Sequence, residues 1–208
     1  MAAGDAAGES TERLTGGSLE GASNVLVLAP TMSDRARRSY FETLLPDNPA
    51  ALDVLSVNYR SSPDQWLDEW QRYAGDRPRR CAIVSIEESA GSGADAGKTR
   101  SDSNTVIQAN SPTDLTGLGI TISQYLDGNG GPQTVITLES LTILLQYVDL
   151  QRAFRFLHVL ANRTIESGSV THYHMDPTAH DEQTVVTLES LFDAVAEFDD
   201  GEWIVRCR

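Results

Sequence analysis

The sequence predicts an α/β fold in which helices cover both faces of a mostly parallel sheet, with an antiparallel hairpin at the C-terminus. Short apolar runs typical of buried strands alternate with segments of helical spacing, and this alternation indicates parallel strands joined by helices. Near the C-terminus, Asp200-Gly201 separates two further runs, and an Asp-Gly pair favours the tight turn of a hairpin. Together, the two patterns predict a three-layer sandwich with the hairpin at one edge.

The elements can be placed in order along the chain. A strand at 25–29 leads into a helix that Ser33 or Asp34 caps. The later elements expected are strands at 52–57, 81–86, 105–108, 133–138, 170–175, 194–198 and 202–207, and helices at 63–73, 112–126 and 150–165. Two similar strings, TVITLESL at 134–141 and TVVTLESL at 184–191, should fold differently. A Gly/Pro turn precedes the first, whereas acidic residues that favour a helix start precede the second.

The chain is expected to hold one domain behind a tail. Residues 1–22 are mostly Gly, Ala, Ser, Thr and acidic residues, which cannot bury enough apolar surface to become ordered. We therefore predict a disordered tail over 1–22 and a single domain over 23–208. Inside the domain, 89–104 is rich in Gly, Ser, Ala and Asp and is expected to be a mobile loop.

The charge balance excludes some functions. With 16 basic and 30 acidic residues, the net charge is -14, which gives nucleic acid little electrostatic reason to bind. Lys98 is the only lysine, and we favour a protein kept soluble by carboxylates in concentrated salt, although a GC-rich genome also replaces Lys by Arg. No apolar run approaches the roughly 18 residues that cross a bilayer. Cys81 and Cys207 are expected to be buried free thiols, which agrees with a reducing compartment. From the thiols and the apolar runs together, we expect a cytoplasmic protein without membrane insertion.

The loop after the first strand lies where a phosphate-binding loop would be. Aligned on G-x-x-x-x-G-K-[ST], the chain has Ala29 and Asp34 for the glycines, Arg35 for the lysine and Ala36 for the hydroxyl residue. Asp34 would bring negative charge toward an anion, and Ala36 cannot bind Mg²⁺, so nucleotide binding should be weak. An ordinary strand-to-helix turn capped by Ser33 or Asp34 would look the same. The residues that would form a degenerate nucleotide site are Thr31, Ser33, Asp34, Arg35 and Glu139.

Carboxylates follow two of the predicted strands. Glu87 and Glu88 come after 81–86, and Glu139 comes after 133–138. Because ligands bind at the carboxyl edge of an open parallel sheet, we expect these groups to converge near the first loop. Carboxylates placed there could polarise water or hold Mg²⁺ through water, and solvated loop glutamates are the equally supported alternative.

These motifs resemble a known family. Glu87-Glu88 resembles the catalytic glutamate pair of KaiC-like ATPases, and 135–142 resembles their Walker B strand, with Glu139 where Asp is usual. The strings SLTILLQYVDLQRAFRFLHVL at 140–160 and VTHYHMDPTAHDEQT at 170–184 look like an uncharacterised haloarchaeal family of KaiC/RecA-like domains. The resemblance runs from about Asn24 to the C-terminus and is most specific in the last third.

The resemblance implies a RecA-like, P-loop NTPase-like fold and a regulatory role, since relatives occur near signalling and taxis domains. It implies action through a protein partner or as a homo-oligomer, with no cofactor and no metal, as a pseudo-ATPase. The alternative is a divergent ATPase that binds ATP and Mg²⁺. Its carboxylates would be Glu87, Glu88 and Glu139, and Arg35 or Lys98 would grip the phosphates.

Two further motifs have structural explanations that we prefer. Gly97-Lys98-Thr99 nearly completes a P-loop, but the first glycine is missing and the following residues start a helix poorly, so a flexible loop is favoured. His172, His174 and His180, with Asp176 nearby, form the only metal-like cluster. No cysteine joins them, and structural hydrogen bonding is favoured over zinc.

Overall fold

The computed structural model describes residues 12–13, 19–31, 33–46, 48–59, 61–86, 98–101, 104–109 and 111–208. Its strands are β1 (Glu12–Arg13), β2 (Asn24–Leu28), β3 (Asp53–Asn58), β4 (Arg80–Ile86), β5 (Lys98–Ser101), β6 (Asn104–Ala109), β7 (Thr134–Glu139), β8 (Val170–Met175), β9 (Ala194–Asp199) and β10 (Glu202–Cys207). Its helices are α1 (Asp34–Thr43), α2 (Pro63–Ala74), α3 (Leu115–Asn129), α4 (Leu141–Tyr147), α5 (Leu150–Ser167) and α6 (Glu182–Glu189), with 3₁₀ turns η1 (Pro49–Ala51) and η2 (Pro177–Ala179).

The strands form one sheet in the order β1-β10-β9-β2-β8-β7-β3-β4-β6-β5. The strands from β9 to β6 in this order are all parallel, while β10 pairs antiparallel with β9 through the turn at Asp200-Gly201. Gly201 has a φ of 90° and Asp200 a φ of 44°, which an Asp-Gly turn accommodates. The predicted mostly parallel sheet with a C-terminal hairpin is confirmed.

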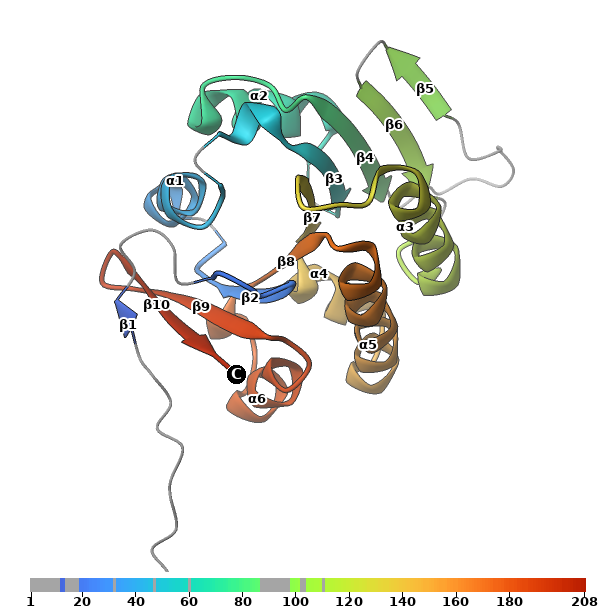
Figure 1. The fold of residues 1–208 in the computed structure, drawn as a ribbon. Coiled ribbons are helices and arrows are strands. Elements are labelled where there is room, and N and C mark those ends of the chain that lie inside the picture. The colour runs from blue at the N-terminus through green and yellow to red at the C-terminus, as the bar shows by residue number, and fades with distance from the viewer. Residues whose placement is uncertain are drawn as a thin grey trace, which may run out of the picture.

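Helices cover both faces of this sheet (Figure 1). On one face, α1 and α2 bury Phe41, Trp66 and Trp70 against the sheet, so the aromatic stripe of α2 is part of the core. On the other face, α3 to α6 form a second apolar cluster that includes Ile122 and Leu157, both fully buried. The molecule is the three-layer α/β sandwich that the sequence predicted.

Some elements differ from the prediction. Residues Glu12–Arg13, in the predicted tail, pair with β10, and Lys98–Ser101, in the predicted mobile loop, pair with β6. Each short strand adds antiparallel to an edge of the sheet, where it satisfies backbone groups that would otherwise face solvent. The helix α3 begins at Leu115, later than expected, because Asp114 caps it by accepting from the Gly117 N–H at 2.9 Å. The helix α4 was not predicted as a separate element.

The two similar strings fold as the sequence indicates. The first forms strand β7, whereas the second lies in helix α6, which Asp181 caps through the Thr184 N–H at 2.7 Å. The cysteines follow the prediction only in part, because Cys81 is buried and Cys207 is exposed at the end of β10. None of the described helices is long and apolar enough to cross a membrane.

Candidate functional site

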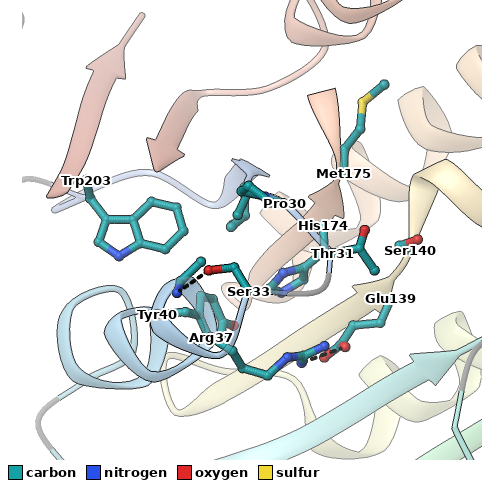
Figure 2. A pocket seen from close by; sticks show the side chains of 13 residues that line it. Pro30, Thr31, Ser33, Arg37, Tyr40, Glu139, Ser140, His174, Met175 and Trp203 are labelled. Atoms are coloured by element: carbon teal, nitrogen blue, oxygen red, sulfur yellow. Dashed lines mark hydrogen bonds and ion pairs between the residues drawn. The ribbon is translucent and has the colours of Figure 1, made fainter. Parts of the chain in front are cut away.

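A small cavity lies at the carboxyl ends of β2, β7 and β8, beside the loop that joins β2 to α1 (Figure 2). This edge is where open parallel sheets usually hold ligands. The cavity has a volume of only about 50 Å³, which is room for a few water molecules, whereas small-molecule sites typically have at least about 300 Å³.

Arg37 of α1 is the cation of the cavity. Its Nη1 donates to Oε2 of Glu139 at 3.0 Å, and its Nε donates to Oε1 of Glu69 in α2 at 2.8 Å. The exposed side-chain fractions are 18% for Arg37, 13% for Glu139 and 27% for Glu69. Burial alone would lower the pKa of Arg37, but the charges of Glu139 and Glu69 outweigh burial, so the pKa is raised and the guanidinium stays charged. An internal cation therefore neutralises the carboxylate at the Walker B-like position.

A buried hydrogen bond joins Tyr40, which lines the cavity, to His172. Tyr40 Oη and His172 Nδ1 lie 2.8 Å apart, and the ring of His174 packs edge-on against Tyr40 with centroids 4.7 Å apart. Burial, assisted by the neighbouring His174, lowers the pKa of His172 to about 3. Burial also raises the pKa of Tyr40 well above its ordinary value, with the charge of Glu139 adding to the shift. Both partners of the hydrogen bond are therefore neutral at neutral pH.

Within the predicted histidine cluster, His172 makes the buried hydrogen bond to Tyr40, and His174 packs against the same ring. His180 follows η2, and burial lowers its pKa, while the charges of Asp176 and Asp181 oppose that shift. Among the described residues, no three His, Cys, Asp or Glu side chains gather as they would around a metal ion.

Two backbone N–H groups at the first loop are also satisfied internally. The Thr31 N–H donates to Oδ2 of Asp176 at 2.8 Å, and Ser33 Oγ accepts from the Ala36 N–H at 3.1 Å to cap α1. Burial would raise the pKa of Asp176, but hydrogen bonds from Thr31 and Thr178 outweigh burial, and the pKa is lowered. In a phosphate-binding loop such N–H groups face the ligand, whereas here a carboxylate of the same chain accepts one of them.

The structure brings together some of the predicted site residues and separates others. Thr31, Ser33 and Glu139 line the cavity. Asp34 is exposed and accepts a hydrogen bond from Tyr73 Oη at 3.3 Å. The guanidinium of Arg35 lies against Gly201 in the hairpin turn, in the space that a Cβ atom there would fill. The cation of the cavity is therefore Arg37, two positions after the residue aligned with the Walker A lysine.

Glu87 and Glu88 lie outside the described residues, so their role stays a prediction. The strand that precedes them, β4, is separated from β7 by β3, and the register places Asn58 of β3 beside Glu139. Lys98 belongs to β5, six places from β2 in the sheet, or roughly 29 Å at ordinary strand spacing. A P-loop lysine lies at the start of a helix, whereas Lys98 begins strand β5, in agreement with the rejection of a P-loop there.

Sequence reasoning missed Arg37, Tyr40 and the bond from Thr31 to Asp176. A signal for the first two was present, because Ser33, Arg37 and Tyr40 are spaced at i, i+4 and i+7 and share one helix face. The motif alignment ended at Ala36, one residue too early to include Arg37. Asp176 caps η2, since it accepts from the Thr178 N–H at 3.0 Å. Its contact with the first loop depends on the packing of β8 beside β2, and no pattern in the neighbouring sequence predicts that contact.

Comparison with one solved structure agrees with the fold. The chain is similar to a Pyrococcus horikoshii OT3 protein, from a structural study of Project ID PH0250, with a TM-score of 0.55 and 11% identity over 88% of this chain and 85% of that one. It is also similar to the flagellar accessory protein FlaH from Methanocaldococcus jannaschii, with a TM-score of 0.48 and 10% identity over 84% of this chain and 70% of that one. A search of curated proteins gave no match. The model of one family, a family of unknown function (DUF7504), matches residues 22–198. Since that match covers most of the chain, the protein belongs to the family of unknown function DUF7504.

Proposed function

We propose that this protein is a non-catalytic RecA/KaiC-like regulatory or signalling protein that acts through protein–protein interaction. In this proposal, the nucleotide site typical of related ATPases has degenerated. The observation that carries the proposal is the ion pair between Arg37 and Glu139, which accompanies a cavity of about 50 Å³ at the expected nucleotide position. A nucleotide would have to displace a partly buried ion pair and still find too little volume.

The first loop supports the same proposal. Asp34 carries a negative charge at the position of the second Walker A glycine, and Ala36 has no hydroxyl to bind Mg²⁺. The charged carboxylate of Asp176 already accepts the Thr31 N–H. A phosphate group brought to Thr31 would meet the carboxylate of Asp176 at short range, and that repulsion opposes binding.

The proposed setting is the cytoplasm of a halophilic archaeon. The net charge of -14 and the single lysine among 16 basic residues support a chain adapted to concentrated salt. The proposed partner is another protein or further copies of the same chain. Light scattering of the purified protein in concentrated and in dilute salt would measure its oligomeric state directly.

Isothermal titration with ATP and Mg²⁺ in concentrated salt tests the proposal. We expect no binding up to about 1 mM nucleotide and no phosphate release. Arg35→Ala is expected to change neither result, because the Arg35 guanidinium lies against Gly201. Arg77→Ala, at an exposed arginine in the loop before β4, is the matched control for the loss of one positive charge.

Micromolar binding of ATP that Arg35→Ala or Lys98→Ala abolishes would contradict the proposal. It would favour the divergent Mg-dependent ATPase, with Glu87, Glu88 and Glu139 as its carboxylates. In that case, Glu87→Gln or Glu88→Gln should abolish hydrolysis while nucleotide binding persists. The two functions therefore give opposite results in the same titration.

A further inference from the structure

A second hollow of the surface lies on the outer side of α3 and α5, which pack side by side (Figure 1). The groove has a volume of about 550 Å³. Its walls include Ile120 and Val159, with exposed fractions of 54% and 62%, and the half-buried Phe156. Single exposed apolar residues are normal, but several that line one groove mark a site of interaction.

Arginines surround this apolar surface. Arg152, Arg155 and Arg163 line the groove, and the only acidic lining residue is Asp127. Arg163 is held in place by Asp127 at 2.6 Å and by Glu166 at 2.9 Å, and Arg152 donates to the carbonyl oxygen of Thr113 at 3.2 Å. The groove is therefore a basic region in a chain whose net charge is -14.

We propose that the α3–α5 groove binds an acidic amphipathic helix of a partner protein. This inference rests on the proposed function, because it names the surface and the partner of the protein–protein interaction. Apolar side chains of the partner at i, i+3/i+4 and i+7 would lie over Ile120, Phe156 and Val159, as in other helix-in-groove complexes. Its carboxylates would meet Arg152 and Arg155, whose planar guanidinium groups can pair with carboxylates through two hydrogen bonds, because Arg163 is already paired with Asp127 and Glu166.

Charge selects this partner over a second copy of the same chain. A two-fold symmetric dimer places the same patch of both copies in contact. The arginines of one groove would then face the arginines of the other, and such like-charge contacts oppose association. An acidic helix has the opposite charge and meets no such repulsion.

A labelled peptide tests the inference with the full-length chain. The probe is a fluorescein-labelled helical peptide of about 15 residues, with Leu at i, i+4, i+7 and i+11 and Glu and Ala elsewhere. One comparison peptide has Lys in place of every Glu, and a second has the residues of the probe in scrambled order. Fluorescence anisotropy is recorded at about 0.15 M salt and in molar KCl, because salt screens the charge contribution and leaves the apolar contribution. We expect a micromolar dissociation constant for the probe and at least about tenfold weaker binding of both comparison peptides.

Variants of α5 locate the site. Val159→Glu places a carboxylate in the groove and is expected to weaken probe binding by at least about tenfold. Ile165→Glu is the matched control, since Ile165 is an exposed β-branched residue of the same helix that does not line the groove. Gly119→Leu should also block the groove, because a Cβ atom at Gly119 would lie 3.7 Å from Cε2 of Phe156, an ordinary contact distance. Circular dichroism checks that each variant is folded.

Several results would overturn the inference. They are equal binding of the Glu and Lys peptides, equal effects of Val159→Glu and Ile165→Glu, or no binding at about 0.1 mM protein. A homodimer in light scattering that Val159→Glu dissociates would assign the groove to a second copy and would also overturn it. ATP binding together with normal peptide binding would contradict the proposed function and leave the inference about the groove intact. If neither ATP nor the peptide binds, the inference about the groove fails and the proposed function stands.

Discussion

Nη1 of Arg37 lies 3.0 Å from Oε2 of Glu139, although the two residues are 102 positions apart in the chain. Both side chains are mostly buried, at 18% and 13% exposure. Removal of one partner from a buried ion pair leaves an uncompensated charge, which costs far more than the intact pair contributes. The pair is therefore better tested as a unit than by either residue alone.

Arg37→Met is expected to lower the free energy of unfolding by about 3 kcal/mol, because it leaves the carboxylate of Glu139 without its cation. The double variant Arg37→Met with Glu139→Gln should recover part of this loss, since only the more exposed carboxylate of Glu69 is then left without its cation. Chemical denaturation of the two single variants, the double variant and the parent chain measures the coupling in a double-mutant cycle. Additive losses in the cycle would show that the pair has no energetic coupling.

The buried His172 predicts loss of stability in mild acid. Its pKa is about 3 in the folded protein, far below the value of about 6.5 in an unfolded chain. Between these values the unfolded state binds more protons, so stability falls as the pH decreases below about 6.5. We expect a loss of about 2 kcal/mol from this residue between pH 7 and pH 5.

His172→Asn removes the titrating group and keeps an acceptor near the position of Nδ1, so its unfolding free energy should depend less on pH. The exposed His158 provides the control, because His158→Asn should leave the pH dependence of the parent unchanged. Denaturation at pH 5, 6 and 7 provides the measurement. Identical slopes for His172→Asn and the parent would rule out the buried histidine as the cause.

Two glycines of α3 are expected to respond oppositely to alanine. A Cβ atom at Gly119 meets only Cε2 of Phe156 at 3.7 Å, so Gly119→Ala should stabilise the protein by about 0.5–1 kcal/mol through helix propensity. A Cβ atom at Gly117 collides with the carboxylate of Asp114, which caps the helix. Gly117→Ala should therefore be neutral or destabilising by about 1 kcal/mol. Thermal unfolding of the two variants compares them directly, and equal shifts would show that the cap adjusts without cost.

Asp176 connects three segments through its hydrogen bonds. It accepts from the Thr31 N–H in the first loop at 2.8 Å and from Thr178 in η2, and its own N–H donates to Thr142 Oγ1 of α4 at 2.9 Å. Asp176→Ala should lower the free energy of unfolding by about 1–3 kcal/mol, since it leaves the Thr31 N–H without its acceptor. Amide hydrogen exchange at Thr31 should become faster.

The capping residue of α6 provides the comparison for Asp176. Asp181→Ala removes the cap of α6, at about 1 kcal/mol, and should leave exchange at Thr31 unchanged. The pKa of Asp176 is lowered in the folded protein. Its contribution to stability is therefore present above the unfolded pKa and is lost as the pH falls through the folded pKa. Unchanged exchange at Thr31 in Asp176→Ala would contradict the proposed link.

The fold could be predicted because its signals are local. Apolar runs mark buried strands, and Ser33, Ser62 and Asp149 cap helices through side chains that accept from N–H groups within three residues along the chain. The helix boundaries depend on these caps. The predicted start of α3 at 112 was too early, because Asp114 was not identified as the residue that caps the helix at Leu115.

The candidate site could be predicted only in part, because its contacts cross the sheet. Thr31, Ser33 and Glu139 were identified from strand ends and an aligned motif, and the structure places them together. Arg37 lies in α1, one residue beyond the end of the aligned phosphate-binding motif, so the motif does not identify it. The bond of Asp176 to the first loop depends on the parallel pairing of β2 with β8, which no local pattern determines.

The strings that form β7 and α6 differ over eight residues by one methylene group, at Ile136 and Val186. Ile136 is fully buried in a strand, whereas Val186 is 54% exposed on a helix. Intrinsic preferences of nearly identical strings cannot favour both outcomes, so the neighbouring segments supply the deciding free energy. An excised peptide of either string, or a fragment library built on short windows, would carry no information about which conformation its parent segment adopts.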